Sequence, residues 1–157
     1  MAMGRMYAVT FENVAVTAGQ DFFEILPATQ KPVAIHACFL SQSTELRDVE
    51  EEQLRIKIIR GHTTSGSGGS SATARPLSPA DTAAGATCEI NNTTIASAGT
   101  AVDLHAETFN VRTGWVYLPT PEMRPVSVNN AIIVVRLMAA PEDSVTMSGT
   151  IIFEELA

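Results

Sequence analysis

Residues 144–153 read Ser-Val-Thr-Met-Ser-Gly-Thr-Ile-Ile-Phe and carry the clearest strand signal in the chain. Apolar side chains take one set of alternate positions, namely Val145, Met147, Ile151 and Phe153. Hydroxyl side chains take the other set, namely Ser144, Thr146, Ser148 and Thr150. Because successive side chains of a strand point to opposite faces, this stretch predicts a strand with one buried and one solvated face.

The same alternation recurs along the rest of the chain. It is clear at residues 7–12 and 54–58, and shorter strands are predicted at 21–26, 101–106, 111–118 and 126–129. Cys88, Ile90 and Ile95 give strand character to residues 87–97. Residues 33–40 and 131–138 are apolar on both faces, which is typical of central strands or of strands at a subunit contact.

These eight to ten strands predict one all-β domain over residues 1–157, an antiparallel β-sandwich or a jelly-roll-like fold. Val, Ile and Thr make up about a quarter of the chain, and β-branched side chains suit pleated sheets. One helix is considered at residues 43–54, where Leu46 and Val49 are spaced by three and Ser43 offers a cap; an acidic loop is the alternative.

A Gly/Ser-rich stretch interrupts the strand pattern. Between Gly61 and Ala74 every residue except His62 is Gly, Ser, Thr or Ala. Small polar side chains bury little apolar area, so we expect a flexible excursion from the sandwich at about residues 61–86. A phosphate-binding loop is not expected, because Ser67 stands where that motif needs Lys.

Charge and composition exclude several classes of protein. The net charge is −7, and only two of the ten basic residues are Lys, so we expect no nucleic-acid partner. The longest apolar runs are far shorter than the roughly 20 residues that span a bilayer, so we expect no membrane partner and no export signal. Cys38 and Cys88 are expected to be buried thiols, with a single disulfide as the alternative.

No catalytic or metal-binding motif is present in the sequence, so we expect no enzyme activity and no cofactor. Asp103 and His105 are two residues apart and are expected to share a strand face, which leaves a weak metal hypothesis that needs a distant His. Trp115 and Tyr117 also share a predicted face, so they are either core residues or a platform for a carbohydrate.

Four segments carry a resemblance to a known family: residues 4–11 (GRMYAVTF), 59–66 (IRGHTTSG), 135–141 (VRLMAAP) and 148–155 (SGTIIFEE). In style they are similar to the small virion structural proteins of tailed bacteriophages, and among these to the capsid cement, or decoration, proteins.

The resemblance implies a β-sandwich or jelly-roll, often trimeric, that binds the outer surface of the major capsid protein lattice and stiffens it. It therefore implies two partners, the major capsid protein and other copies of the chain, and a location on the outside of the virion after synthesis in the host bacterial cytoplasm. We expect the contacts to involve Arg5, His62, Ser65, Ser67 and Arg75.

Three alternatives stay open at this point. The chain is another virion component, such as a head–tail connector, a tail protein or a fibre-associated protein; or it is a carbohydrate-binding module that uses Trp115 and Tyr117; or it is a small β-barrel enzyme with a metal at Asp103 and His105.

Overall fold

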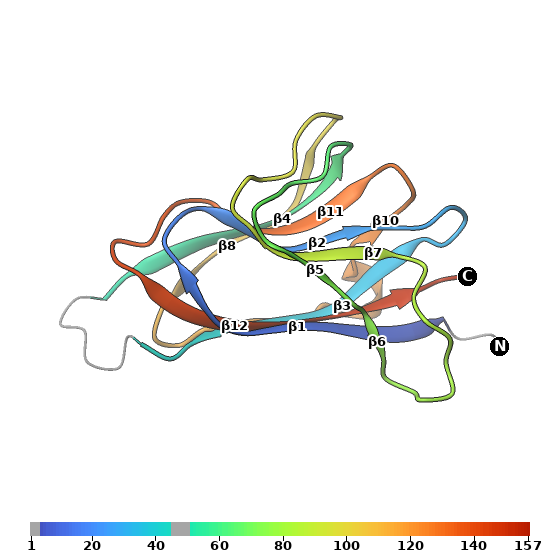
Figure 1. Cartoon of the computed structure of the whole chain (residues 1–157), viewed down its shortest axis with the longest axis horizontal. Helices are drawn as coiled ribbons and strands as arrows, with labels where there is room; N and C mark the ends of the chain where they lie inside the picture. The colour runs from blue at the N-terminus through green and yellow to red at the C-terminus, as the bar shows by residue number, and fades with distance from the viewer. Residues whose placement is uncertain (1–3, 45–50) are drawn as a thin grey trace.

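A computed structural model describes residues 4–44 and 51–157. Within these residues twelve strands form two antiparallel sheets, which pack face to face as a β-sandwich (Figure 1). This confirms the predicted fold class, whereas jelly-roll connectivity stays a prediction. The start of β1 and the end of β12 lie at the same end of the sandwich, where Arg5 pairs with Glu155 (Figure 1).

The two sheets are named A and B. Sheet A contains β1 (Arg5–Val16), β3 (Val33–Gln42), β6 (Arg75–Pro76), β9 (Trp115–Tyr117), β10 (Val126–Ser127) and β12 (Val145–Glu155), in the order β10-β3-β12-β1-β6, with β9 also on the edge of β3. Sheet B contains β2 (Gln20–Leu26), β4 (Gln53–His62), β5 (Ser70–Ala72), β7 (Thr87–Asn92), β8 (Val102–Asn110) and β11 (Ile132–Leu137), in the order β5-β7-β2-β11-β4-β8.

The core lies between the sheets and follows the predicted alternation. Along β12, buried and half-buried residues alternate over the whole strand. Tyr7 stacks on Phe153 with ring centroids 5.6 Å apart, and Phe11 packs beside Phe22 and Phe23. Strand β11 is buried on both faces, as expected of a central strand, because Ala96 packs on its outer side with Ile132 and Val134.

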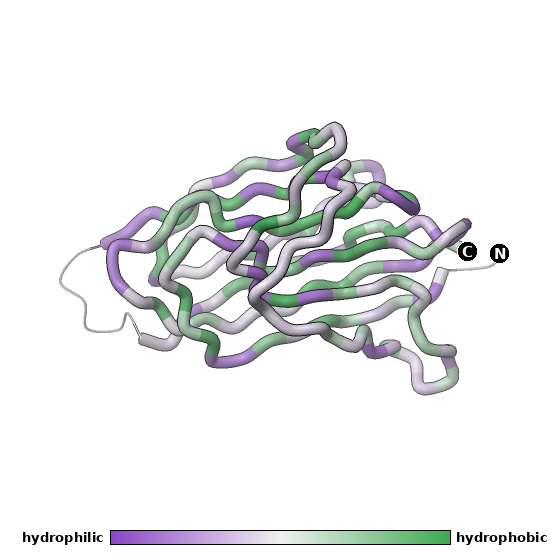
Figure 2. The backbone as a smooth tube through the Cα atoms, turned by 45° about the horizontal axis from the view of Figure 1, so that its top comes forward, coloured by the Kyte–Doolittle hydropathy of each residue, from purple (hydrophilic) through white to green (hydrophobic). Residues whose placement is uncertain are grey.

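The stretch predicted as a flexible excursion at about residues 61–86 contains segments that pair with other parts of the chain. Residues 62–69 and 91–98 form what we call the lobe, in which Thr64 bridges Ser97 and Ser67 bridges Thr94. The two segments rise side by side from sheet B (Figure 1), and their Gly, Ser and Thr residues give a pale tube in Figure 2. Residues 70–72 and 75–76 then form β5 and β6. Mobility of this stretch in solution stays a prediction.

Two further predictions concern the strand expected at residues 111–118 and the helix considered at residues 43–54. Residues 111–118 were expected to be one strand, but only β9 is extended, because Asn110 accepts bonds from the backbone nitrogens of Arg112 and Thr113 and so holds a turn. Gly114 completes that turn with a φ of 71°. The helix considered at 43–54 falls mainly on residues 45–50, outside the described part, and its last two residues belong to β4.

Regular helix is almost absent from the described residues, where the 3-10 turn η2 (Pro121–Met123) links β9 towards β10. Accordingly, residues 4–44 and 51–157 include no helix long and apolar enough to cross a membrane.

Candidate functional site

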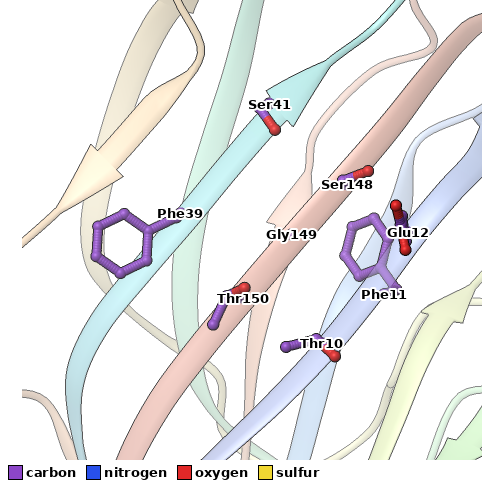
Figure 3. Close-up of a pocket in the computed structure, with 8 residues that line it drawn as sticks. All are labelled: Thr10, Phe11, Glu12, Phe39, Ser41, Ser148, Gly149 and Thr150. Atoms are coloured by element: carbon purple, nitrogen blue, oxygen red, sulfur yellow. The ribbon is translucent and has the colours of Figure 1, made fainter.

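The outer face of sheet A carries a shallow groove of about 330 Å³ (Figure 3). It runs over β1, β12 and β3 and is lined by Thr10, Phe11, Glu12, Phe39, Ser41, Ser148, Gly149 and Thr150. One register row crosses the groove, in which Thr10 stands opposite Thr150 and Thr150 opposite Phe39. The row continues on β9 with Val116, which is 61% exposed. This face therefore offers hydroxyls and apolar side chains, with Glu12 as its single charge among the lining residues.

Gly149 gives the groove its floor. A Cβ atom at this position would lie 2.7 Å from Phe11 Cε1 and 2.8 Å from Leu40 Cδ2, so only glycine lets these side chains close beneath β12. The floor is thus rigid and packed, since protein cores leave little free volume. The groove presents no pair of acid and base groups that could catalyse a reaction at its lining.

A second polar cluster lies at the edge where β8 of sheet B faces β9 of sheet A. His105 Nε2 donates to Glu107 Oε2 over 2.8 Å, and Trp115 Nε1 donates to the same oxygen over 2.8 Å. The His105 ring lies 4.7 Å from Tyr117, which stacks on Trp115. The hydrogen bond from Trp115, with that from His105, lowers the pKa of Glu107 below its ordinary value. Trp115 is 2% exposed, so its ring is packed inside this edge and not offered to solvent.

Asp103 and His105 were expected to share a face, and this was wrong. A register irregularity between Ile58 and Ile59 places His105 opposite Ile58, which belongs to the core, and Asp103 opposite Ile59, which packs on the outside of sheet B. A bulge adds one residue to a strand and so reverses the expected side. Asp103 instead bonds Lys57 Nζ at 2.7 Å.

No group of three or more His, Cys, Asp or Glu side chains that could hold a metal occurs within residues 4–44 and 51–157.

The base of the lobe is a buried ionic network on the outer face of sheet B. Arg136 Nε bonds Asp21 Oδ1 at 2.6 Å, and Arg136 Nη2 donates to the carbonyl of Ala96 at 3.0 Å. Asp21 also accepts the backbone nitrogen of Ala96 at 2.8 Å. His62 Nδ1 lies 3.1 Å from the carbonyl of Ala98 and must donate there, so its Nε2 is free to accept from Arg136 at 3.3 Å. The network ties both lobe segments to the sheet.

Two carboxylates of sheet B hold a second part of the lobe, around Ser65 and Gly66, in the same way. Glu24 and Glu89 stand directly opposite each other on β2 and β7. The Nδ2 of Asn92 lies 3.0 Å from Glu24 and 2.6 Å from Glu89, and Ser65 Oγ lies 2.5 Å and 3.1 Å from the same two carboxylates. Gly66 adds a backbone donor to Glu24 at 3.0 Å. The donors that satisfy these acids all come from the lobe, which makes the pair a structural anchor.

The five contact residues expected from the sequence separate into two places. Ser65 and Ser67 are exposed on the lobe, whereas His62 is 8% exposed and bonded within it. Arg5 and Arg75 are exposed on β1 and β6, at the edge of sheet A, where Arg5 Nη1 bonds Thr82 Oγ1 at 2.7 Å. Arg5 and Arg75 therefore lie on two paired strands of sheet A, whereas His62, Ser65 and Ser67 lie in one lobe segment beside sheet B.

Sequence reasoning missed the buried acids and Arg136, although a signal was present. Asp21 and Glu24 interrupt the apolar strand at residues 21–26, and Arg136 interrupts the most apolar strand of all. Charges inside strands that are buried on both faces need partners, so they point to a covering segment. Which segment covers them depends on the bridges at Thr64 and Ser67, which no local pattern predicts.

Comparisons with known proteins add no relative to this description, because no family model, curated protein or solved structure matches the chain.

Proposed function

We propose that the chain is a non-enzymatic structural protein of a tailed-bacteriophage virion, a capsid decoration protein that binds the major capsid protein lattice and stabilises it. The observation that carries the proposal is the outer face of sheet A. Its central row consists of the uncharged side chains Thr10, Thr150, Phe39 and Val116, each of them exposed or half-buried. Exposed apolar faces on small soluble domains mark surfaces for other proteins.

The resemblance supports the same role, and its four segments correspond to the scaffold of the sandwich. Residues 4–11 and 148–155 lie in β1 and β12, and residues 135–141 begin in β11. Only residues 59–66 reach a surface feature, since they run from β4 into the lobe. The similarity therefore concerns how the body is built, and the sheet A face supplies the contact.

The contact that we propose is flat and needs no cofactor. Hydroxyl and aromatic side chains on one sheet face can lie against a strand or loop of the capsid protein, and affinity comes from many such contacts repeated over the lattice. Arg75 is exposed at the edge of the same sheet and stands opposite Ala8, which has the parity of Thr10, so it adds one positive charge beside this face. Arg5 lies on the side of β1 that carries Tyr7. We propose trimers or other symmetric oligomers as the form that meets the lattice.

The test is cosedimentation with expanded, undecorated capsids assembled from the major capsid protein of the same phage. We expect the wild type to bind, and Thr150→Glu, which puts a charge at the centre of the face, to bind about tenfold more weakly or worse. Thr108→Glu is the matched control, because Thr108 is exposed on β8 of the other sheet. Absence of wild-type binding, or equal loss in both variants, would contradict the proposal.

A further inference from the structure

Strand β8 is an open edge of sheet B. It pairs with β4 on one side and ends the strand order of the sheet. Apart from these bonds to β4, no residue from 102 to 109 makes a backbone hydrogen bond within the described chain. Five of these eight residues are exposed, namely Val102, Asp103, Ala106, Glu107 and Thr108. An edge of this kind presents unpaired N–H and C=O groups that can pair with another strand.

Apolar side chains gather at the same edge of the sandwich. Val102 is 44% exposed on β8, and Leu118 and Val126 are 65% and 38% exposed on the segment that borders sheet A. Arg60, which stands opposite Val102, donates from Nη1 to the carbonyl of Val126 at 2.7 Å, so β10 lies beside the start of β8. The open backbone edge and these apolar side chains therefore form one surface, which a partner would cover together.

We propose that this surface binds a second copy of the chain, with the two β8 strands pairing antiparallel about a two-fold axis through Ala106. Two-fold interfaces join the same patch on both copies, so a residue faces itself at the axis and its neighbours exchange partners. Pairing about Ala106 places two small side chains opposite each other. It also places His105 of each copy opposite Glu107 of the other, where the imidazole can donate a hydrogen bond to the carboxylate as it does within one chain.

The other registers are less favourable on charge. An axis through Glu107 sets Glu107 opposite itself, and like charges directly opposite each other destabilise a strand pair. An axis through His105 sets His105 opposite itself and Glu107 opposite the irregular end of β8, so it gains no His–Glu pair. An axis through Thr108 sets Glu107 opposite Phe109 and likewise gains no His–Glu pair. Complementarity with itself is thus the reason to assign the edge to a second copy.

The pair is expected to be weak, with Kd in the micromolar range. The register irregularity opposite Ile58 and Ile59 limits the regular part of β8 to His105–Asn110, and small interfaces fall in the transient class. The inference does not depend on the capsid role. It predicts a dimer, whereas the resemblance implies a trimer.

Mass measurement by light scattering on the full chain tests the inference. From about 1 to about 100 µM we expect the wild type to pass from 16.7 kDa to twice that mass. Ala106→Lys sets two like charges opposite each other and should raise Kd about tenfold or more. Thr108→Lys is the matched control: it adds the same charge to the same strand, again opposite a basic residue of β4, and should change Kd less than about threefold.

A mixture makes the test specific to the register. Ala106→Lys and Ala106→Glu, each weakened alone, should form a dimer together, because Lys then faces Glu at the axis. Thermal unfolding of each variant at the lowest concentration checks the fold of the monomer. A wild type that stays at one chain, a trimer, an Ala106→Lys protein that dimerises normally, or a mixture that shows no recovery would each overturn the inference. A monomer that still binds capsids would overturn it and leave the proposed function intact.

Discussion

Asp21 and Arg136 form a buried ion pair beneath the lobe, with Arg136 Nε 2.6 Å from Asp21 Oδ1 and side-chain exposures of 0% and 9%. Arg136→Met leaves the Asp21 carboxylate buried without its cation, and such a loss costs about 3–5 kcal/mol. We therefore expect the free energy of unfolding in urea to fall by about that amount. The double variant Asp21→Leu/Arg136→Met removes both charges and should be more stable than Arg136→Met alone. A loss below about 1 kcal/mol in the single variant would show that the pair does not hold the lobe.

The ion pair also marks the limit of what the sequence predicts. Period-2 alternation identifies the strands at 7–12, 54–58 and 145–153, because inner and outer faces of a sandwich strand differ in polarity. Period-2 alternation does not predict the paired structure of the lobe, because the lobe residues are small and polar. They are held by backbone bridges and by hydrogen bonds to Asp21 and Glu24. Those contacts join residues far apart in the chain, so no local pattern encodes them.

The group of His105, Glu107, Trp115 and Tyr117, which we call the edge cluster, shows a second limit of prediction from the sequence. The sequence singles out His105, Trp115 and Tyr117, but as members of separate metal and carbohydrate hypotheses. The structure brings them together around Glu107, because β8 and β9 meet across the two sheets. The side on which Asp103 lies depends on one bulge, and a single extra residue in a strand leaves no trace in the hydropathy pattern.

Glu155 anchors the segment between β6 and β7. Its carboxylate is 1% exposed and accepts the backbone nitrogens of Gly85, at 2.9 Å, and Ala86, at 3.0 Å. In Glu155→Gln one acceptor oxygen is replaced by a donor and the negative charge is lost, so we expect stability to fall by about 1–3 kcal/mol. Hydrogen exchange at the amides of Gly85 and Ala86 should accelerate. Glu154→Gln, on the outer side of the same strand, is the control, and equal acceleration in both variants would contradict the anchoring role.

Protonation of Glu107 at low pH should weaken the edge cluster and so lower the stability of the fold. Its pKa in the folded chain lies below the ordinary value of 4.5, because Trp115 and His105 donate to its carboxylate. The stabilisation is therefore complete above pH 4.5 and is lost as the pH falls through the lowered pKa. Glu107 is 44% exposed, so solvent screening keeps the contribution within about 1 kcal/mol. The fluorescence of Trp115, the single Trp, should change in that acid range, and Glu107→Gln should abolish the change; a persisting change in the variant would assign it to another group.

Gly149 is expected to be intolerant of any side chain. In Gly149→Ala the new Cβ would meet Phe11 and Leu40 at 2.7 and 2.8 Å, and overpacking of this kind costs about 1–3 kcal/mol. Urea unfolding measures the loss. Thr150→Ser, one residue away on the outer face, should stay within about 0.5 kcal/mol of the wild type. A Gly149→Ala variant as stable as the wild type would contradict this prediction, because it would show that Phe11 and Leu40 leave space for a Cβ atom.

Cys38 and Cys88 should be inert thiols in the folded chain. Both are free and buried. Burial raises the pKa of the Cys38 thiol far above its usual range, and burial with the nearby Glu155 carboxylate raises that of Cys88 to about 12. Because the thiolate is the reactive form, an aromatic disulfide reagent at pH 8 should modify neither residue until urea unfolds the chain, and should then modify two per chain. Cys88→Ala should halve the number modified after unfolding, and rapid modification of the native wild type would contradict the burial of both side chains.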